Sequence, residues 1–204
     1  MLAYAFLDHG RRSYVTDAVW PPAGDWIDAA GHMRACSADD LPWWLDEELW
    51  EVELEGDVQE LGRALTASRA RLVRRVDAWT DDVATELVAV CARRVRDEAV
   101  SALRQTGRAE DAATLADAAG PEEIESAATE IAGGGDAAAR LAGLAADVVL
   151  YARDANGPVR AAGVAAYVAA YALAGGDKRA PGYQEGFDAE RRWQACWLKH
   201  RLML

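Results

Sequence analysis

A histidine and a cysteine stand four positions apart near the N-terminus, at His32 and Cys36. Together these side chains can form a nucleophile with its base, or supply ligands to a zinc ion. The surrounding letters, GHMRAC followed by a serine, favour a strand or loop over the helix face that would suit this spacing. The chain has three histidines in all, and a single cysteine is usually a small buried apolar residue. We therefore predict no metal site.

Four polar side chains are candidates for chemistry that needs no cofactor: Tyr14, His32, Glu51 and Arg74, with Trp44 as a wall. Ligand sites prefer the junctions between parts of a protein. We therefore place this hypothetical site where the N-terminal part meets the helices. The positions in the sequence do not show that these residues converge. A cofactor-independent enzyme is thus one of two open hypotheses.

Aromatic residues supply the candidate binding residues. Trp43 and Trp44 are adjacent, so in a helix they point about 100° apart and cannot both face one core. We assign Trp44 a ligand or partner role, with a role in the core as the alternative. Tyr167 and Tyr171 share a helix face through their four-residue spacing and can line a polar pocket. A tyrosine stripe is also typical of a core with its hydroxyls near the surface.

An excess of acids in the second half of the chain supports the other hypothesis. Residues 109–150 contain one basic residue, Arg140, and nine acids: Glu110, Asp111, Asp117, Glu122, Glu123, Glu125, Glu130, Asp136 and Asp147. A field of one sign suits the steering of a basic partner, although a solvated helix face has the same composition. We favour an accessory or partner-binding protein that uses this acidic helical surface.

The overall charge limits the classes of partner that the protein is expected to bind. The net charge is -12, from 22 Lys and Arg against 34 Asp and Glu. Such a chain repels phosphate backbones and anionic membranes, so general nucleic-acid binding and membrane binding are disfavoured. No apolar stretch is long enough to span a bilayer. The Ala-rich helices bury little area each, which leaves a homodimer open.

Common catalytic signatures are absent from the sequence. We find no phosphate-binding Gly-rich loop ending in Lys-Ser/Thr, no H-E-x-x-H, no C-x-x-C and no G-x-S-x-G. We therefore predict no cofactor. The three cysteines, Cys36, Cys91 and Cys196, are far apart and odd in number, which favours reduced thiols in the cytoplasm.

The N-terminal part is predicted to contain strands. Residues 2–7 read as a strand, and residues 39–46 as a short helix behind a Ser37 cap. In LWEVELEGD, apolar residues alternate with three glutamates. This period of two residues is typical of a half-buried strand. Some of the arginines of residues 60–76 should lie across a sheet from that glutamate face, because opposite charges across a ladder attract.

The rest of the chain is predicted to be helical. Apolar residues recur every fourth position from Val83 to Leu103, between a Thr80 cap and Gly107. Further helices are expected at about 109–119, 122–132, 137–155, 158–174 and 187–202. The predicted fold is α+β: a small antiparallel sheet packed against an Ala-rich, mainly antiparallel helical bundle. We divide the chain at 1–79 and 80–204, with the helix of residues 187–202 packing back on the N-terminal part.

Four segments carry a family resemblance: GHMRAC, DLPWWLDEELWEVELEGD, RLVRRVDAW and AERRWQACWL. Together they resemble a bacterial protein family that has no established activity. The resemblance covers both ends of the chain and is weak through residues 112–155. It implies an architecture but no function. Members of that family tend to carry a second cysteine shortly before the Gly/His segment, and here no cysteine precedes Cys36. A paired-cysteine metal site is therefore not implied.

Overall fold

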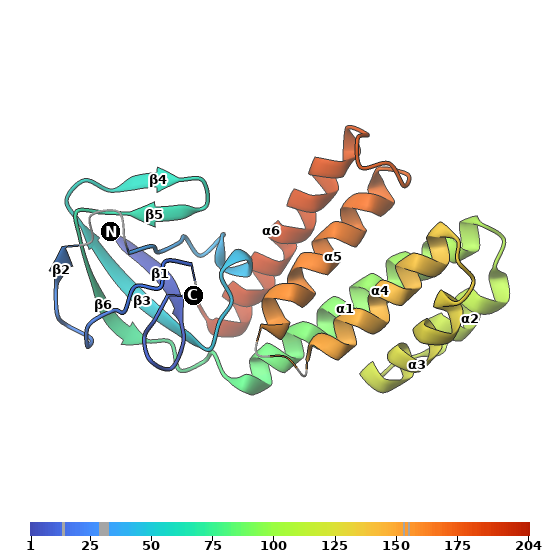
Figure 1. The fold of residues 1–204 in the computed structure, drawn as a ribbon, viewed down its shortest axis with the longest axis horizontal. Helices are drawn as coiled ribbons and strands as arrows, with labels where there is room; N and C mark the ends of the chain where they lie inside the picture. Colours follow the sequence, from blue (N-terminus) through green and yellow to red (C-terminus); the bar gives the residue numbers. More distant parts are fainter. Residues whose placement is uncertain (14, 29–32, 153, 155) are drawn as a thin grey trace. The chain divides into compact units, whose positions relative to one another are not determined.

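The chain is described by a computed structural model that covers residues 1–13, 15–28, 33–152, 154 and 156–204. It divides into two compact units. The sheet unit comprises Met1–Ala84 with Gln194–Leu204, and the helical unit comprises Thr85–Trp193. The predicted α+β class is confirmed, with strands in the N-terminal part and helices from residue 81 onward (Figure 1). The predicted packing of residues 187–202 on the N-terminal part stays a prediction.

The sheet unit is built on a four-stranded antiparallel sheet. Its order is β1-β3-β6-β2, formed by β1 (Leu2–Leu7), β3 (Glu48–Glu55), β6 (Arg69–Arg75) and β2 (Ile27–Asp28). A separate hairpin pairs β4 (Gln59–Leu61) with β5 (Ala64–Thr66). Gly62 turns this hairpin with a φ of 64°, a left-handed conformation that glycine adopts at little cost.

One face of the sheet forms the core of the sheet unit. Alternate residues of the three long strands point to this face, because side chains in a strand alternate between its two sides. Trp20 completes the cluster and is almost fully buried. The core cluster contains Ala3, Ala5, Leu7, Trp20, Ala35, Val52, Leu54, Leu65, Ala67, Ala70 and Leu72.

The other face of the sheet carries an ion-pair ladder, which we define as Glu51–Arg74, Glu53–Arg71 and Glu55–Arg69. Each glutamate of β3 lies opposite its arginine of β6 in the strand register. Arg71 Nη2 lies 2.6 Å from Glu53 Oε2, and Arg69 Nη1 lies 3.2 Å from Glu55 Oε2. The prediction that some of these arginines lie across from the glutamate face is therefore confirmed for Arg69, Arg71 and Arg74.

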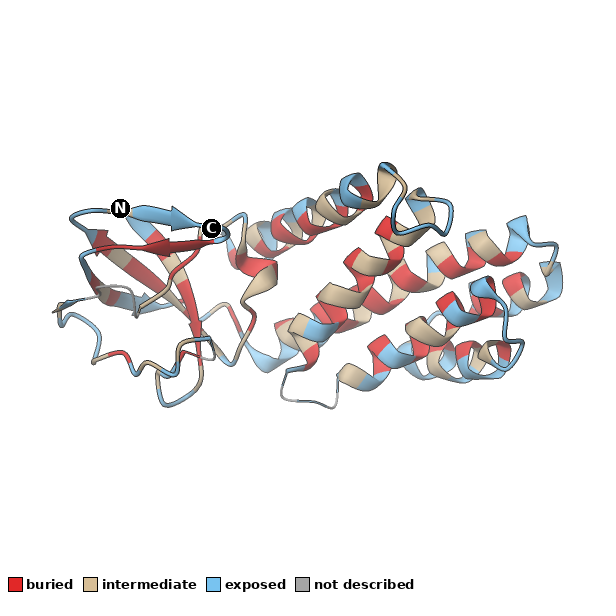
Figure 2. Cartoon of the chain, turned by 45° about the horizontal axis from the view of Figure 1, so that its top comes forward, coloured by how far each residue is buried: buried red, intermediate tan, exposed pale blue. Residues whose placement is uncertain are grey.

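Six helices follow the strands in the described residues: α1 (Asp81–Gln105), α2 (Ala109–Asp117), α3 (Pro121–Ala132), α4 (Ala137–Tyr151), α5 (Gly157–Leu173) and α6 (Gly182–Leu202). The predicted four-residue stripe of α1 is buried along its length, from Val83 to Leu103. The Thr80 hydroxyl accepts a hydrogen bond from Val83 N at 3.3 Å, and Gly107 follows the helix with a φ of 80°. Figure 2 shows buried residues on one side of the helices and exposed residues on the other.

The predicted helices at 109–119, 122–132 and 158–174 differ from the structure by one or two residues at an end, and the one expected at 137–155 ends at Tyr151. Two other predicted helices differ more. The helix expected at residues 39–46 is only a 3-10 turn, Leu41–Trp43, because Ser37 donates its hydroxyl to the Asp40 carboxylate instead of capping. Helix α6 begins at Gly182, five residues before the predicted start. Packing overrides the poor helix propensity of GYQEG there. Gly186 lies so close to α5 that an added Cβ would be 2.9 Å from Ala170 Cα.

Candidate functional site

The four catalytic candidates are only partly described by the structure. Tyr14 and His32 lie outside the described residues. Glu51 and Arg74 are brought together on β3 and β6, and Tyr4 of β1 pairs with Glu51 in the register. Tyr4, Glu51 and Arg74 therefore form one row across three neighbouring strands. Tyr4 is a residue that the sequence alone did not single out.

This row lines the sheet cavity, a hollow of about 450 Å³ in the sheet unit. The Glu51 side chain is 11% exposed, whereas Arg74 is 64% exposed. Arg74 Nε donates to Glu51 Oε2 at 2.8 Å, and Nη2 donates to Oε1. Burial, together with the Glu51 charge, raises the pKa of Tyr4. The cavity is lined by Tyr4, Glu51, Arg74, Val76, Asp77, Ala78, Leu202, Met203 and Leu204.

The row in the sheet cavity is better suited to holding the sheet together than to catalysis. Glu51 is bound at both oxygens by Arg74, so it is not poised as a base. The pair is a cross-strand rung like the others of the ion-pair ladder, although the strand register shifts between Glu51 and Val52. Burial also raises the pKa of the Cys36 thiol far above its usual range, which keeps that thiol protonated and a poor nucleophile.

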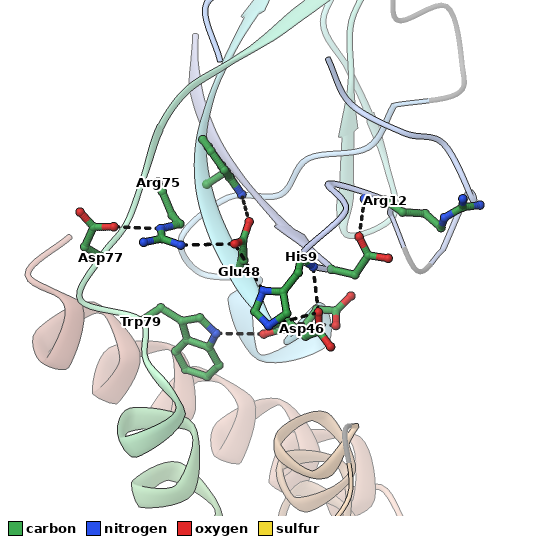
Figure 3. A network of polar contacts seen from close by, with 10 residues as sticks. His9, Arg12, Asp46, Glu48, Arg75, Asp77 and Trp79 are labelled. Atoms are coloured by element: carbon green, nitrogen blue, oxygen red, sulfur yellow. Dashed lines mark hydrogen bonds and ion pairs between the residues drawn. The ribbon is translucent and has the colours of Figure 1, made fainter. Parts of the chain in front are cut away.

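A second polar network in the sheet unit surrounds Glu48 (Figure 3). Its carboxylate accepts hydrogen bonds from Trp50 Nε1 at 3.0 Å and from Arg75 Nη1 at 3.3 Å, and His9 Nδ1 lies 3.4 Å away. The bond to Glu48 raises the pKa of the exposed His9. The network ties a turn to β3 and β6. Neither here nor elsewhere in the described residues do three His, Cys, Asp or Glu side chains gather in a way that could hold a metal.

The predicted aromatic residues have different surroundings. Trp43 lies under the guanidinium of Arg63, 4.1 Å from the ring centre. The Trp44 indole nitrogen is buried, and within the described part of the chain it has no hydrogen-bond partner. Trp44 lines none of the cavities named in this subsection. Its predicted binding role stays a prediction.

Three of the nine predicted surface acids serve the local structure of the helices. Glu123 accepts hydrogen bonds from Ala119 N and Gly120 N, and these bonds lower its pKa. Asp136 accepts from Ala139 N at 2.8 Å as the cap of α4, and pairs with Arg108. Asp111 also pairs with Arg108. Part of the acidic composition thus reflects helix termini, where acids are stabilising.

The helical unit contains a hollow of about 410 Å³, which we call the helical cavity. One wall is a polar stripe of α1, spaced so that its members share one helix face. The opposite wall comes from α4, α5 and the turn after α5, and consists mainly of small apolar residues. The lining residues are Glu98, Ser101, Ala102, Gln105, Thr106, Ala137, Ala138, Leu141, Ala169, Tyr171, Ala172, Leu173, Gly175 and Gly176.

One of the two predicted tyrosines lines the helical cavity. Tyr171 forms part of its wall, and its ring stacks on Tyr167 with the ring centres 5.9 Å apart. Tyr167 in turn contacts the Tyr183 ring edge-on and lies under the Lys178 ammonium. Tyr167 therefore supports the cavity wall instead of lining it.

Glu98 is the distinctive residue of the helical cavity. Its half-buried carboxyl forms no hydrogen bond or ion pair with any described residue. Burial raises the pKa of Glu98, and the nearby Arg94 charge only partly opposes this effect. Arg94 is occupied elsewhere: its Nε lies 2.9 Å from both carboxylate oxygens of Glu190, and its guanidinium lies 3.8 Å from the Trp193 ring centre.

A smaller hollow of about 80 Å³, the recess, adjoins the helical cavity. Glu98 and Ala169 line both spaces. The other lining residues of the recess are Arg94, Asp97, Ala165 and Glu190. Sequence reasoning missed Glu98, although Glu98, Ser101 and Gln105 do form a polar stripe at helical spacing beside the apolar one. The stripe resembles a solvated face until the Ala-rich helices are placed opposite it.

Helices of the described residues do not combine the length and apolar character that a membrane span requires. In comparisons with known proteins, no family model, no curated protein and no solved structure matched this chain.

Proposed function

We propose that the protein binds a small amphipathic molecule in the helical cavity of its helical unit. The observation that supports this function most directly is Glu98, a half-buried carboxyl without a hydrogen-bond partner among the described residues, on the wall of a 410 Å³ cavity. A titratable group that is perturbed by burial inside a cavity marks a functional site more often than an ordinary surface position.

The dimensions and lining of the cavity fit a ligand of modest size. Binding pockets for small molecules typically enclose about 300–1,000 Å³ and combine apolar walls with a few polar groups. Here alanines and leucines of α4 and α5 face the polar stripe of α1. A ligand with an apolar body and one polar head would satisfy both walls.

The state of Glu98 favours a functional role over a structural one. Glu190 is buried and is held by Arg94, whereas Glu98 is half-buried and its carboxyl oxygens are accessible to solvent. Buried polar groups are usually paired inside the protein, but an accessible carboxyl on a cavity wall does not need a protein partner. A ligand head group in the cavity can therefore pair with Glu98.

The test is a binding experiment with the full chain. Saturation-transfer NMR would use n-octylamine, n-octanol and n-octanoate, which share an apolar tail and differ in their head groups. We expect at least one of them to bind saturably. The variant Ala172→Leu fills part of the cavity and should weaken that binding about tenfold or more, since it removes the space for the tail.

Ala116→Leu is the matched control, because Ala116 is exposed on α2 and does not line the cavity. It should bind the ligand as the wild type does. If none of the three molecules binds, or if Ala172→Leu binds as well as Ala116→Leu, the proposed function is wrong.

The enzyme hypothesis from the sequence stays a prediction, because none of its candidates is among the described residues that line the helical cavity. The helical cavity itself supports small-molecule binding. Docking of a basic partner on the acidic helical surface stays a prediction. Native mass spectrometry of the gently purified protein separates the two, because a bound small molecule supports the cavity and a second polypeptide supports the surface.

A further inference from the structure

We infer that the ligand of the helical cavity is a primary amine, whose ammonium group lies beside Glu98 at the mouth of the recess and whose apolar body lies along the alanines of α4 and α5. This ligand class rests on the function proposed above. It specifies the head group, which the cavity volume alone does not.

The charges around Glu98 favour a cation. Three carboxylates line the recess, those of Asp97, Glu98 and Glu190, against the single guanidinium of Arg94. Arg94 is bound at close range by Glu190, and Asp97 by Arg96. Among the described residues that line the helical cavity, none is a lysine, arginine or histidine. Glu98 is therefore the charge that a ligand meets, and an anionic head would be repelled.

The hydrogen-bonding groups also suit an ammonium. A primary ammonium has three donors and no acceptor. The polar stripe offers acceptors on consecutive turns: the Glu98 carboxylate, the Ser101 hydroxyl and the Gln105 amide oxygen. Gln105 Nε2 lies 3.4 Å from Ser101 Oγ, which leaves the oxygen of that amide available. An alcohol could use one or two of these acceptors but would leave the Glu98 charge unpaired.

The volumes of the recess and the helical cavity indicate where the head group and the apolar tail of the ligand lie. The recess, at about 80 Å³, accepts a small polar head, and the helical cavity, at about 410 Å³, accepts the rest of the molecule. Glu98 and Ala169 stand where the two spaces meet. Tyr171 adds an aromatic face to the larger space, and such faces attract both apolar groups and cations.

Binding of an amine should depend on pH through Glu98. Arg94 and Asp97 face this carboxyl from α1, Glu190 faces it from α6 and Tyr171 lies on the α5 side, whereas the lining residues of α4 are not titratable. Burial raises the pKa of Glu98 above its usual 4.5. Because binding needs both the ammonium and the ionised carboxylate, affinity should be constant from about neutral pH up to the pKa of the amine, and should fall as pH drops through the raised pKa of Glu98.

The decisive experiment is calorimetric titration of the full chain with n-octylamine, n-octanol and n-octanoate. We expect n-octylamine to bind at least about tenfold more tightly than n-octanol, and n-octanoate to bind least. Glu98→Gln should weaken n-octylamine about 10- to 100-fold, because it removes a charge-assisted hydrogen bond. The same variant should leave n-octanol nearly unchanged.

Glu86→Gln is the matched control: Glu86 is an exposed acid of the same helix, lines neither space, and changes the net charge equally. It should bind n-octylamine as the wild type does. Equal or tighter binding of n-octanol or n-octanoate, or no effect of Glu98→Gln, would overturn the amine while keeping the cavity. Absence of binding by all three molecules would overturn both the amine and the proposed function.

Discussion

Two neighbouring carboxyl groups of the helical unit, Glu190 and Glu98, differ in burial and in pairing. Glu190 is almost fully buried, with its side chain 2% exposed, and is held by Arg94. Glu98 lies one helical turn from Arg94 and has no such partner among the described residues. This contrast separates a carboxyl that stabilises the fold from one that is available to a ligand.

Replacing Arg94 tests the structural half of that contrast. Arg94→Met removes the guanidinium from the buried Glu190 carboxylate; because the Arg94 side chain is 37% exposed, the loss of stability should be about 2–3 kcal/mol, below the roughly 3–5 kcal/mol of a fully buried pair. Arg71→Met, which breaks an exposed rung of the ion-pair ladder, should cost about 1 kcal/mol or less. Urea unfolding measures both. Equal losses of stability in the two variants would contradict the structural role of the Arg94–Glu190 pair.

Replacing Glu98 tests whether this carboxyl is kept at a cost to the stability of the folded protein. Because the pKa of Glu98 is raised in the folded state, this group contributes stability below its unfolded pKa and loses it as pH rises through the folded pKa. Glu98→Gln removes that loss, so the variant should gain stability relative to the wild type between acidic and neutral pH. Solvent screening limits the gain to about 1 kcal/mol or less.

Thermal unfolding across that pH range measures the effect. A gap between variant and wild type that does not change with pH would show that Glu98 is not perturbed. Greater stability together with weaker amine binding would be the signature of a residue kept for function.

At the scale of single elements, the spacing of apolar residues and the helix-capping residues predicted most of the helices and strands. The stripe of α1, its Thr80 cap and the glutamate face of β3 all follow local rules, and the structure confirms them. The start of α6 does not follow local rules, because glycines at 182 and 186 disfavour a helix. The close packing of α6 against α5 outweighs this low helix propensity. The periodicity of the sequence does not predict such close packing.

The close packing of α6 against α5 can be tested by replacing each of two glycines, Gly186 and Gly163, with alanine. An added Cβ at Gly186 would lie 2.9 Å from Ala170 Cα and 3.0 Å from Ala169 O. Gly186→Ala should therefore destabilise the protein by about 1–3 kcal/mol through overpacking. At Gly163, within α5, the nearest atom is an arginine nitrogen at 3.6 Å.

Gly163→Ala should consequently be neutral or stabilising by up to about 1 kcal/mol, the gain in helix propensity. Chemical denaturation compares the two variants directly. A stable Gly186→Ala protein would mean that α5 and α6 do not pack as closely as the structure has them.

At the scale of the whole molecule, the periods of the apolar residues predicted the class of fold but not the site. The alternation in LWEVELEGD and the four-residue period from Val83 to Leu103 indicated strands followed by helices, and the structure is α+β. The helical cavity depends on three helices from residues 98–176, so its wall is assembled from positions that are distant in sequence. Glu98 looked like any acid on a solvated helix until α4 and α5 were placed opposite it. Tyr171 was accessible to sequence reasoning because its spacing from Tyr167 lies within one helix.

The net charge of -12 is consistent with the same ligand chemistry at long range. An acidic protein concentrates small cations near its surface and disfavours anions. Helix-terminal acids such as Glu123 and Asp136 contribute to this field while serving local structure. The field alone does not select a ligand, because specific contacts are needed for that.

The most direct test of the helical cavity is methyl NMR of the full chain, with labelled alanine and leucine, during titration with n-octylamine. We predict saturable shifts for the methyl groups that line the cavity, including Ala102, Leu141 and Ala172, with Ala3 and Ala5 of the sheet core unchanged. Shifts confined to the sheet unit, or no shifts at all, would contradict a ligand site in the helical unit.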